Sequence, residues 1–156
     1  MNGEEIYQVK KSAEVISEEN VKFLKELPAE KKVNIDNRNL LFVHGSPFNP
    51  LNGYVYPDSD ISQFEGLLYD VIFMGHTHRP FIKKSGMKTI VNVGSCGLPR
   101  DIGNRLTVVM YDTITNETTV KEFCMDVNNV LNNYGTLIHA SVKDVLNRNN
   151  KIFSNE

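Results

Sequence analysis

The sequence predicts an α/β domain, and three observations carry this prediction. Apolar runs at residues 40–43 and 71–74 have the character of buried strands, and each ends at a loop that contains glycine. Helical periodicity covers both ends of the chain, before residue 28 and after residue 127. Histidines closely follow both apolar runs. Because open α/β sheets place ligand sites at the carboxyl ends of strands, these histidines are the first candidates for a functional site.

Length and composition fit one domain. The 156 residues are 40% hydrophobic and 23% charged, close to globular averages, and a chain of this length buries roughly two-thirds of its unfolded surface. We place the domain at residues 1–150 and a polar tail at residues 151–156. No apolar run approaches the roughly 20 residues that a membrane span needs, so no membrane association is expected.

Charge and cysteine content narrow the expected partners and location. The formal net charge is −2 and basic residues are scattered, so nucleic acid is not an expected partner. Residues 1–5 are acidic where a secretory signal would be basic. Cys96 and Cys124 form no CxxC pair, and we expect free thiols in a cytoplasmic protein.

The amino-terminal residues predict two helices. Apolar residues between Ile6 and Ile16 recur at steps of three and four, which marks one face of a helix. Ser17 suits the cap of a second helix, because Glu18 and Glu19 follow it in the first turn. Pro28 ends that helix.

Strands and turns fill the middle of the chain. Alternation at residues 32–36 and the run at 40–43 predict a hairpin whose turn is Asn37-Arg38. The proline-rich stretch 45–59 predicts a long functional loop, and Asp58-Ser59-Asp60 is suited to cap a short helix after it. Two more antiparallel pairs are predicted at residues 81–84 with 88–92 and at residues 106–111 with 118–123. Helical character then returns from Val127 to Arg148, with a break at Gly135.

Three loops that contain glycine carry the candidate site residues: 44–46, 75–78 and 94–97. In the second loop, His76 and His78 can serve one ion or two neighbouring ions, or have no role, because Thr77 can lie in a turn. Glycines of the third loop let N–H groups approach an anion, although for this loop alone ordinary turn chemistry is the favoured explanation. Imidazole binds divalent transition metals, which bind phosphate oxygens, so the three loops together favour metal-assisted phosphoryl chemistry. His139 lies outside these loops and is expected to be a surface or packing residue.

These motifs resemble those of the calcineurin-like metallophosphoesterases, in particular their small bacterial and archaeal phosphodiesterase-like branch. The similarity runs from about Ser12 to the terminal helix, and the residues that carry it are 43–47, 75–80, 91–95, Pro99-Arg100 and Tyr111-Asp112. It implies an α/β/β/α sandwich with two divalent ions at the strand ends, commonly manganese, iron, zinc or nickel.

The resemblance also implies roles for particular residues. His44 and His76 would bind one ion, and His78 would bind the other. Ser95, Arg79 and Arg100 would bind the phosphate-ester substrate. A water activated by the metals would attack phosphorus, which makes the chain a hydrolase homologue.

Three motifs of this family are absent from the 156 residues: Asp-x-His, Gly-Asp-x-x-Asp and Gly-Asn-His-Asp/Glu. The resemblance therefore implies the carboxyl-terminal portion of the fold, without the amino-terminal strands that supply the carboxylate between the two metals. Without that anion two divalent ions repel each other, so we expect this chain alone to be inactive and name no catalytic residue.

Three interpretations stay open. The first is a phosphoesterase fragment or subunit completed by a separate amino-terminal segment. The second is a non-catalytic remnant that binds a partner, or a second copy of itself, through uncovered sheet. The third is a module that holds a single ion with His44, His76 and His78.

Overall fold

A computed structural model describes residue 6 and residues 9–150, and the tail predicted at residues 151–156 lies outside them. The elements in chain order are α2 (Val9–Val15), α3 (Glu18–Glu26), β1 (Glu30–Ile35), β2 (Arg38–Val43), the 3₁₀ helix η1 (Ser62–Phe64), β3 (Val71–Met74), β4 (Phe81–Ser85), β5 (Lys88–Asn92), β6 (Arg105–Asp112), β7 (Glu117–Cys124), α4 (Val127–Tyr134) and α5 (Ala140–Leu146).

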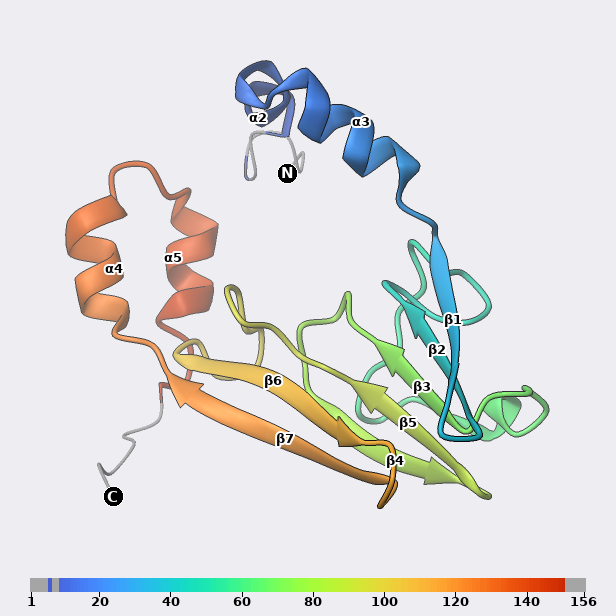
Figure 1. Cartoon of the computed structure of the whole chain (residues 1–156). Helices are drawn as coiled ribbons and strands as arrows, with labels where there is room; N and C mark the ends of the chain where they lie inside the picture. The colour runs from blue at the N-terminus through green and yellow to red at the C-terminus, as the bar shows by residue number, and fades with distance from the viewer. Residues whose placement is uncertain (1–5, 7–8, 151–156) are drawn as a thin grey trace.

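A five-stranded sheet in the order β1-β2-β3-β5-β4 forms the centre of the molecule (Figure 1). Strands β2, β3 and β5 are parallel, and the antiparallel strands β1 and β4 flank them. Strands β6 and β7 form a separate antiparallel pair. The structure thus confirms the predicted α/β class.

Apolar side chains cover both faces of the central sheet. All four residues of β3 are buried, as expected for a parallel strand packed on both sides. On one face Ile72 and Met74 pack with Val55 and Phe64, which come from the segment between β2 and β3.

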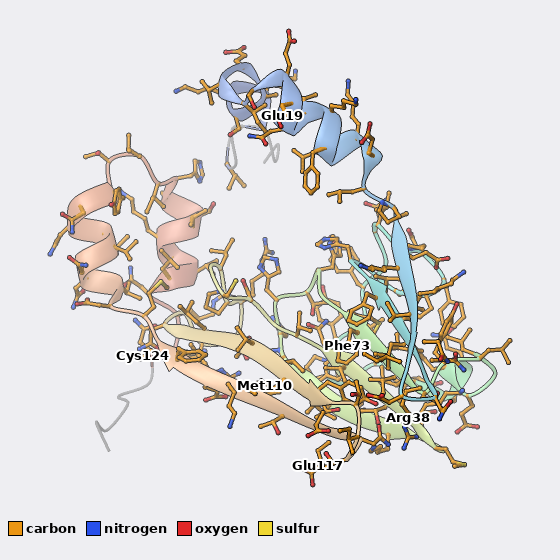
Figure 2. The ribbon with its side chains drawn as sticks, in the orientation of Figure 1. Glu19, Arg38, Phe73, Met110, Glu117 and Cys124 are labelled. Atoms are coloured by element: carbon orange, nitrogen blue, oxygen red, sulfur yellow. The ribbon has the colours of Figure 1, made fainter. Side chains whose placement is uncertain are left out.

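The opposite face packs against β6. Phe73 stacks on Phe42 at a ring-centroid distance of 4.9 Å and meets the ring of Tyr111 edge-on at 5.7 Å. Val109 of β6 packs into the same cluster. Phe73 therefore lies between the central sheet and the β6–β7 pair (Figure 2).

The β1–β2 hairpin turns one residue earlier than predicted. Asp36 and Asn37 both have positive φ, 48° and 59°. Positive φ at both central residues is the type I′ arrangement, whose twist matches that of the two strands. Arg38 already belongs to β2, where it pairs with Ile35.

Helix α3 begins and ends as predicted, but none of its side chains is buried. The Ser17 hydroxyl accepts a hydrogen bond from the Asn20 N–H at 3.3 Å. Phe23, Leu24 and Leu27 are each more than half exposed, at 60%, 53% and 52%. Helices α2 and α3 extend away from both sheets (Figure 1). Leu24 and Leu27 line an open hollow with residues of β1 and β2, which leaves this apolar stripe largely uncovered among the described residues.

Two smaller helical predictions need adjustment. The helix predicted after residues 58–60 is only the single turn of η1. The N–H of Ser62, its first residue, donates a hydrogen bond to Asp60 Oδ1 at 2.9 Å. His139 is the N-cap of α5, where its Nδ1 accepts from the Ser141 N–H at 3.2 Å. In the described part of the chain, no helix combines the length and apolar content needed to cross a membrane.

Candidate metal centre

The parallel order of β2, β3 and β5 brings the three predicted loops to one edge of the sheet. His44 follows β2, and its carbonyl accepts a hydrogen bond from the Gly75 N–H at 3.0 Å. The Val93 N–H donates to the carbonyl of Met74 at 2.8 Å, which ties the loop after β5 to the end of β3. Backbone hydrogen bonds between the ends of neighbouring strands therefore position all three loops.

His44 and His76 face each other across this edge. The His44 Nε2 and His76 Nδ1 atoms are 2.8 Å apart, and the two rings are nearly perpendicular at a centroid distance of 4.7 Å. Burial lowers the pKa of His76 below its ordinary value, and the nearby positive charges of His44, His78 and Arg100 lower it further. His76 is thereby biased toward the neutral imidazole, the form that binds metals.

His78 points to a different partner. Its Nδ1 lies 2.7 Å from the carbonyl oxygen of Leu98, so the ring donates through Nδ1. This tautomer leaves the Nε2 lone pair available. A carbonyl that fixes the second nitrogen in this way is the usual support of a metal-bound histidine.

The turn that separates the two histidines is tight and backed by a buried asparagine. The Thr77 N–H bonds the Gly75 carbonyl at 2.7 Å, and both His76 and His78 have positive φ, 62° and 56°. Asn92 Nδ2 donates to the Gly75 carbonyl at 2.7 Å and to Thr77 Oγ1 at 3.0 Å. The turn predicted as one of the open alternatives is therefore present.

Asn92 also reaches the third loop, a supporting role that was not predicted although the residue lies in the motif at residues 91–95. Its Oδ1 accepts from the Gly94 N–H at 3.0 Å, and its side chain is fully buried. The available signal was an amide residue at the end of an otherwise apolar strand.

Several N–H groups of the loop after β5 already have acceptors within the protein. The N–H groups of Gly97 and Leu98 donate to Ser95 Oγ at 3.3 Å and 2.9 Å, and the Ser95 N–H donates to Thr107 Oγ1 at 3.1 Å. These contacts are the ordinary turn chemistry that was the alternative to an anion cradle. Ser95 Oγ still has its own proton to donate.

Gly94 is required by geometry. Its φ is +73°, and a Cβ atom at this position would overlap Thr107 Oγ1 and lie 3.0 Å from the Cβ of Pro80. A side chain here would therefore push the loop away from the sheet.

The two predicted arginines lie at the rim and are exposed. The Arg79 guanidinium lies 5.6 Å from the ring centroid of Tyr56. The Arg100 N–H donates to the His78 carbonyl at 3.2 Å, and Arg148 Nη1 donates to the Arg100 carbonyl at 3.0 Å. Backbone contacts thus hold Arg100 beside His78.

The facing nitrogens of His44 and His76 are at hydrogen-bonding distance, which is close to the spacing that one divalent ion needs. Two nitrogens that bind a tetrahedral ion at about 2.0–2.1 Å lie roughly 3.3 Å apart, so the pair needs to open by only about half an ångström. In the described part of the chain no cluster of three or more His, Cys, Asp or Glu side chains is arranged to hold a metal. Among the described residues, therefore, no carboxylate joins the His44–His76 pair in such a cluster.

Comparison with known proteins identifies the family of the chain. The sequence profile of the calcineurin-like phosphoesterase superfamily domain matches residues 6–116. An uncharacterized protein of Methanocaldococcus jannaschii is 32% identical over 116 residues, which are 63% of this chain and 46% of that protein.

Two crystal structures have the same fold. A hypothetical protein from Pyrococcus horikoshii superposes with a TM-score of 0.71 at 22% identity, over 86% of this chain and 56% of that one. A metallophosphoesterase from Sphaerobacter thermophilus also gives 0.71, at 21% identity, over 84% of this chain and 61% of its own length. This chain thus spans about half the length of the relatives it matches. On the profile match and the shared fold, the chain belongs to the calcineurin-like phosphoesterase superfamily.

Proposed function

We propose that this chain supplies the histidine ligands of a two-metal phosphoesterase centre. His44 and His76 hold one divalent ion and His78 holds the second. The observation that carries this proposal is the 2.8 Å approach of His44 Nε2 and His76 Nδ1 at the carboxyl ends of parallel strands. Imidazole ligands suit manganese, iron, nickel and zinc.

The substrate in this proposal is a phosphate ester. The ions supply an activated water and hold phosphate oxygens. Arg100 lies exposed next to His78, where its guanidinium is suited to a forked contact with phosphate. Arg79 is also exposed and lies against Tyr56, where it is suited to contact another part of the ester. Ser95 adds a hydroxyl donor in the loop after β5.

The carboxylate ligands have to come from polypeptide other than the described residues. Two neighbouring divalent ions need an anion between them to offset their repulsion, and three neutral imidazoles provide none. We therefore assign hydrolysis to the complete centre, formed with the remaining portion of the fold. We place the protein in the cytoplasm, consistent with the two exposed free thiols, Cys96 and Cys124.

A second candidate function is a non-catalytic, partner-binding role. A groove of about 650 Å³ between the central sheet and β6 supports it, because the groove is lined mainly by apolar side chains. A monomer by light scattering that does not bind the amino-terminal portion of a family member would contradict this role.

Metal binding tests the main proposal. Equilibrium dialysis of the chain mixed with the amino-terminal portion of a family member, in Mn²⁺, Ni²⁺ or Zn²⁺, should show bound metal. His44→Ala or His76→Ala should lower the affinity at least tenfold, since each removes one of two ligands that this chain gives to the same ion. His139→Ala is the matched control, because this histidine caps α5 away from the centre. Binding far below one ion per chain, or equal binding by all variants, would contradict the proposal.

Hydrolysis tests the completed centre. Bis-p-nitrophenyl phosphate should be hydrolysed in Mn²⁺ when the chain is mixed with the amino-terminal portion of a family member, and not by the chain alone. Loss of this activity in His78→Ala would show that hydrolysis requires the second ion, which His78 binds in this proposal. No activity in any metal would refute a catalytic role.

A further inference from the structure

A row of stacked side chains leads away from the metal ligands. The ring of Tyr54 lies 4.2 Å from the ring of His76, centroid to centroid, with the planes tilted by 53°. Tyr56 lies nearly parallel to Tyr54, at 14° and 6.0 Å. The Arg79 guanidinium, 5.6 Å from the Tyr56 ring, ends the row, which begins at the His44–His76 pair.

The loop that carries the two tyrosines is held in place. Val55, between them, is 6% exposed and packs into the hydrophobic core. The Gly45 N–H bonds the Pro50 carbonyl at 2.6 Å, and the Tyr56 N–H bonds Ser59 Oγ at 2.8 Å. Because the side chain of Val55 is buried in the core, the side chains of Tyr54 and Tyr56 on either side of it point to the surface. The loop is already ordered, so binding a ligand there costs little further conformational entropy.

These rings are exposed where burial would be expected. Tyr54 is 61% exposed and Tyr56 is 37% exposed. At 6.0 Å and near-parallel planes the rings form an offset stack, which leaves aromatic area of both in contact with water. Exposed aromatic area that continues directly from a candidate metal site is typical of ligand recognition.

We propose that Tyr54 and Tyr56 form a stacking platform for the planar ring of the substrate, which makes the substrate a nucleotide or another aryl phosphate ester. This inference rests on the proposed phosphate site, because the platform would recognise the aromatic group that is esterified to the phosphate. Tyr54 contacts His76 directly, so a single small ester spans the metal ligands and the platform. Arg79 strengthens the outer end through its contact with the Tyr56 ring.

Ligand binding in Mn²⁺ tests the platform without relying on catalysis. Calorimetry or ligand-detected NMR with AMP, adenosine, ribose 5-phosphate and inorganic phosphate separates the ring from the phosphate. AMP should bind about fivefold or more tightly than ribose 5-phosphate, the range expected for stacking one base on an aromatic side chain. Phenyl phosphate in the same series distinguishes a simple aryl group from a nucleobase.

Three variants connect the preference with the platform. Tyr54→Ala should remove the advantage of AMP over ribose 5-phosphate, while Tyr54→Phe should retain it because the ring remains. Tyr134→Ala on α4, a tyrosine that is 59% exposed, is the matched control and should change nothing.

The outcomes separate this inference from the proposed function. Equal binding of AMP, ribose 5-phosphate and inorganic phosphate overturns the platform and leaves the metal centre intact. Tyr54-dependent binding of adenosine without binding of phosphate supports the platform and counts against the proposed function. If Tyr54→Ala weakens Mn²⁺ and phosphate as much as AMP, Tyr54 only positions His76, and the platform is overturned. No binding by any ligand counts against both.

Discussion

Asn92 joins two of the loops of the candidate centre through one buried side chain. Its amide contacts the Gly75 carbonyl, Thr77 Oγ1 and the Gly94 N–H, so both loops depend on the same group. The positive φ values of His76 and His78 are unfavourable by about 1 kcal/mol or more each, and tertiary contacts of this kind maintain them.

Asn92→Ala should lower the free energy of unfolding by about 2–3 kcal/mol, because it leaves buried donors and acceptors without partners. The same variant should weaken metal binding, since the turn between His76 and His78 is no longer held. Urea denaturation and metal titration measure the two effects. Asn52→Ala, at an exposed loop position, is the control, and a similar small loss in both variants would show that Asn92 is not a support.

Stability should depend on pH through His76. Its pKa in the folded protein is below its ordinary value of 6.5, chiefly because of burial. The unfolded chain therefore binds more protons in the interval between the folded pKa and 6.5, and the free energy of unfolding falls as the pH drops through that interval. Above 6.5 this contribution is complete.

The measurement is urea denaturation in EDTA between about pH 7.5 and pH 5. His76→Asn should flatten the dependence, because asparagine tolerates positive φ and does not titrate. An unchanged pH profile in His76→Asn would assign the slope to other groups.

At the scale of an element, the β1–β2 hairpin presents His44 on a fixed register. Its type I′ turn requires positive φ at both Asp36 and Asn37. Strand β2 also pairs in parallel with β3, with Phe42 opposite Phe73, and this pairing places the ends of the two strands side by side.

Asn37→Val should destabilise the protein by about 1–2 kcal/mol, because a β-branched residue strongly disfavours positive φ. Asn37→Gly is the matched control and should be close to neutral, since glycine accepts this conformation. Thermal or urea unfolding compares the two. Equal losses would locate the effect in the side chain of Asn37 rather than in its backbone.

At the scale of the whole molecule, apolar surface remains open between the central sheet and β6. The groove is lined by Lys31, Val33, Ile35, Leu40, Phe42, Phe73, Val93, Val109, Tyr111 and Thr113. The chain spans about half the length of its relatives, and the groove is apolar surface that the described residues leave open.

The folded protein should bind a hydrophobic dye such as ANS in this groove. Ile35→Glu should reduce the dye signal by roughly half, because it adds a charge to an apolar surface of limited area. Met87→Glu makes a comparable change in the β4–β5 turn, where Met87 is 97% exposed and outside the groove, and should have little effect. Equal reductions would show that the dye binds elsewhere.

Much of the local structure and the chemical type of the site followed from the sequence alone. Periodicity placed the buried strand at residues 71–74 and the two terminal helical regions, because burial and helix geometry repeat over short distances. The histidine and glycine motifs indicated metal-binding ancestry, since few other side chains bind transition metals. The capping role of Ser17 was also readable, because it depends on neighbours within one turn.

Only the tertiary structure decided how these parts meet. The order β2-β3-β5 sets His44 against His76, although 32 positions separate them. The family resemblance implied this pairing, but no local pattern in the sequence encodes it. The support by Asn92 and the stacked tyrosines beside His76 likewise depend on contacts between distant segments. Local periodicity in the sequence indicates which face of a helix or strand is buried. The candidate site, in contrast, forms where several strands end, and the strand ends come together only when the whole core packs.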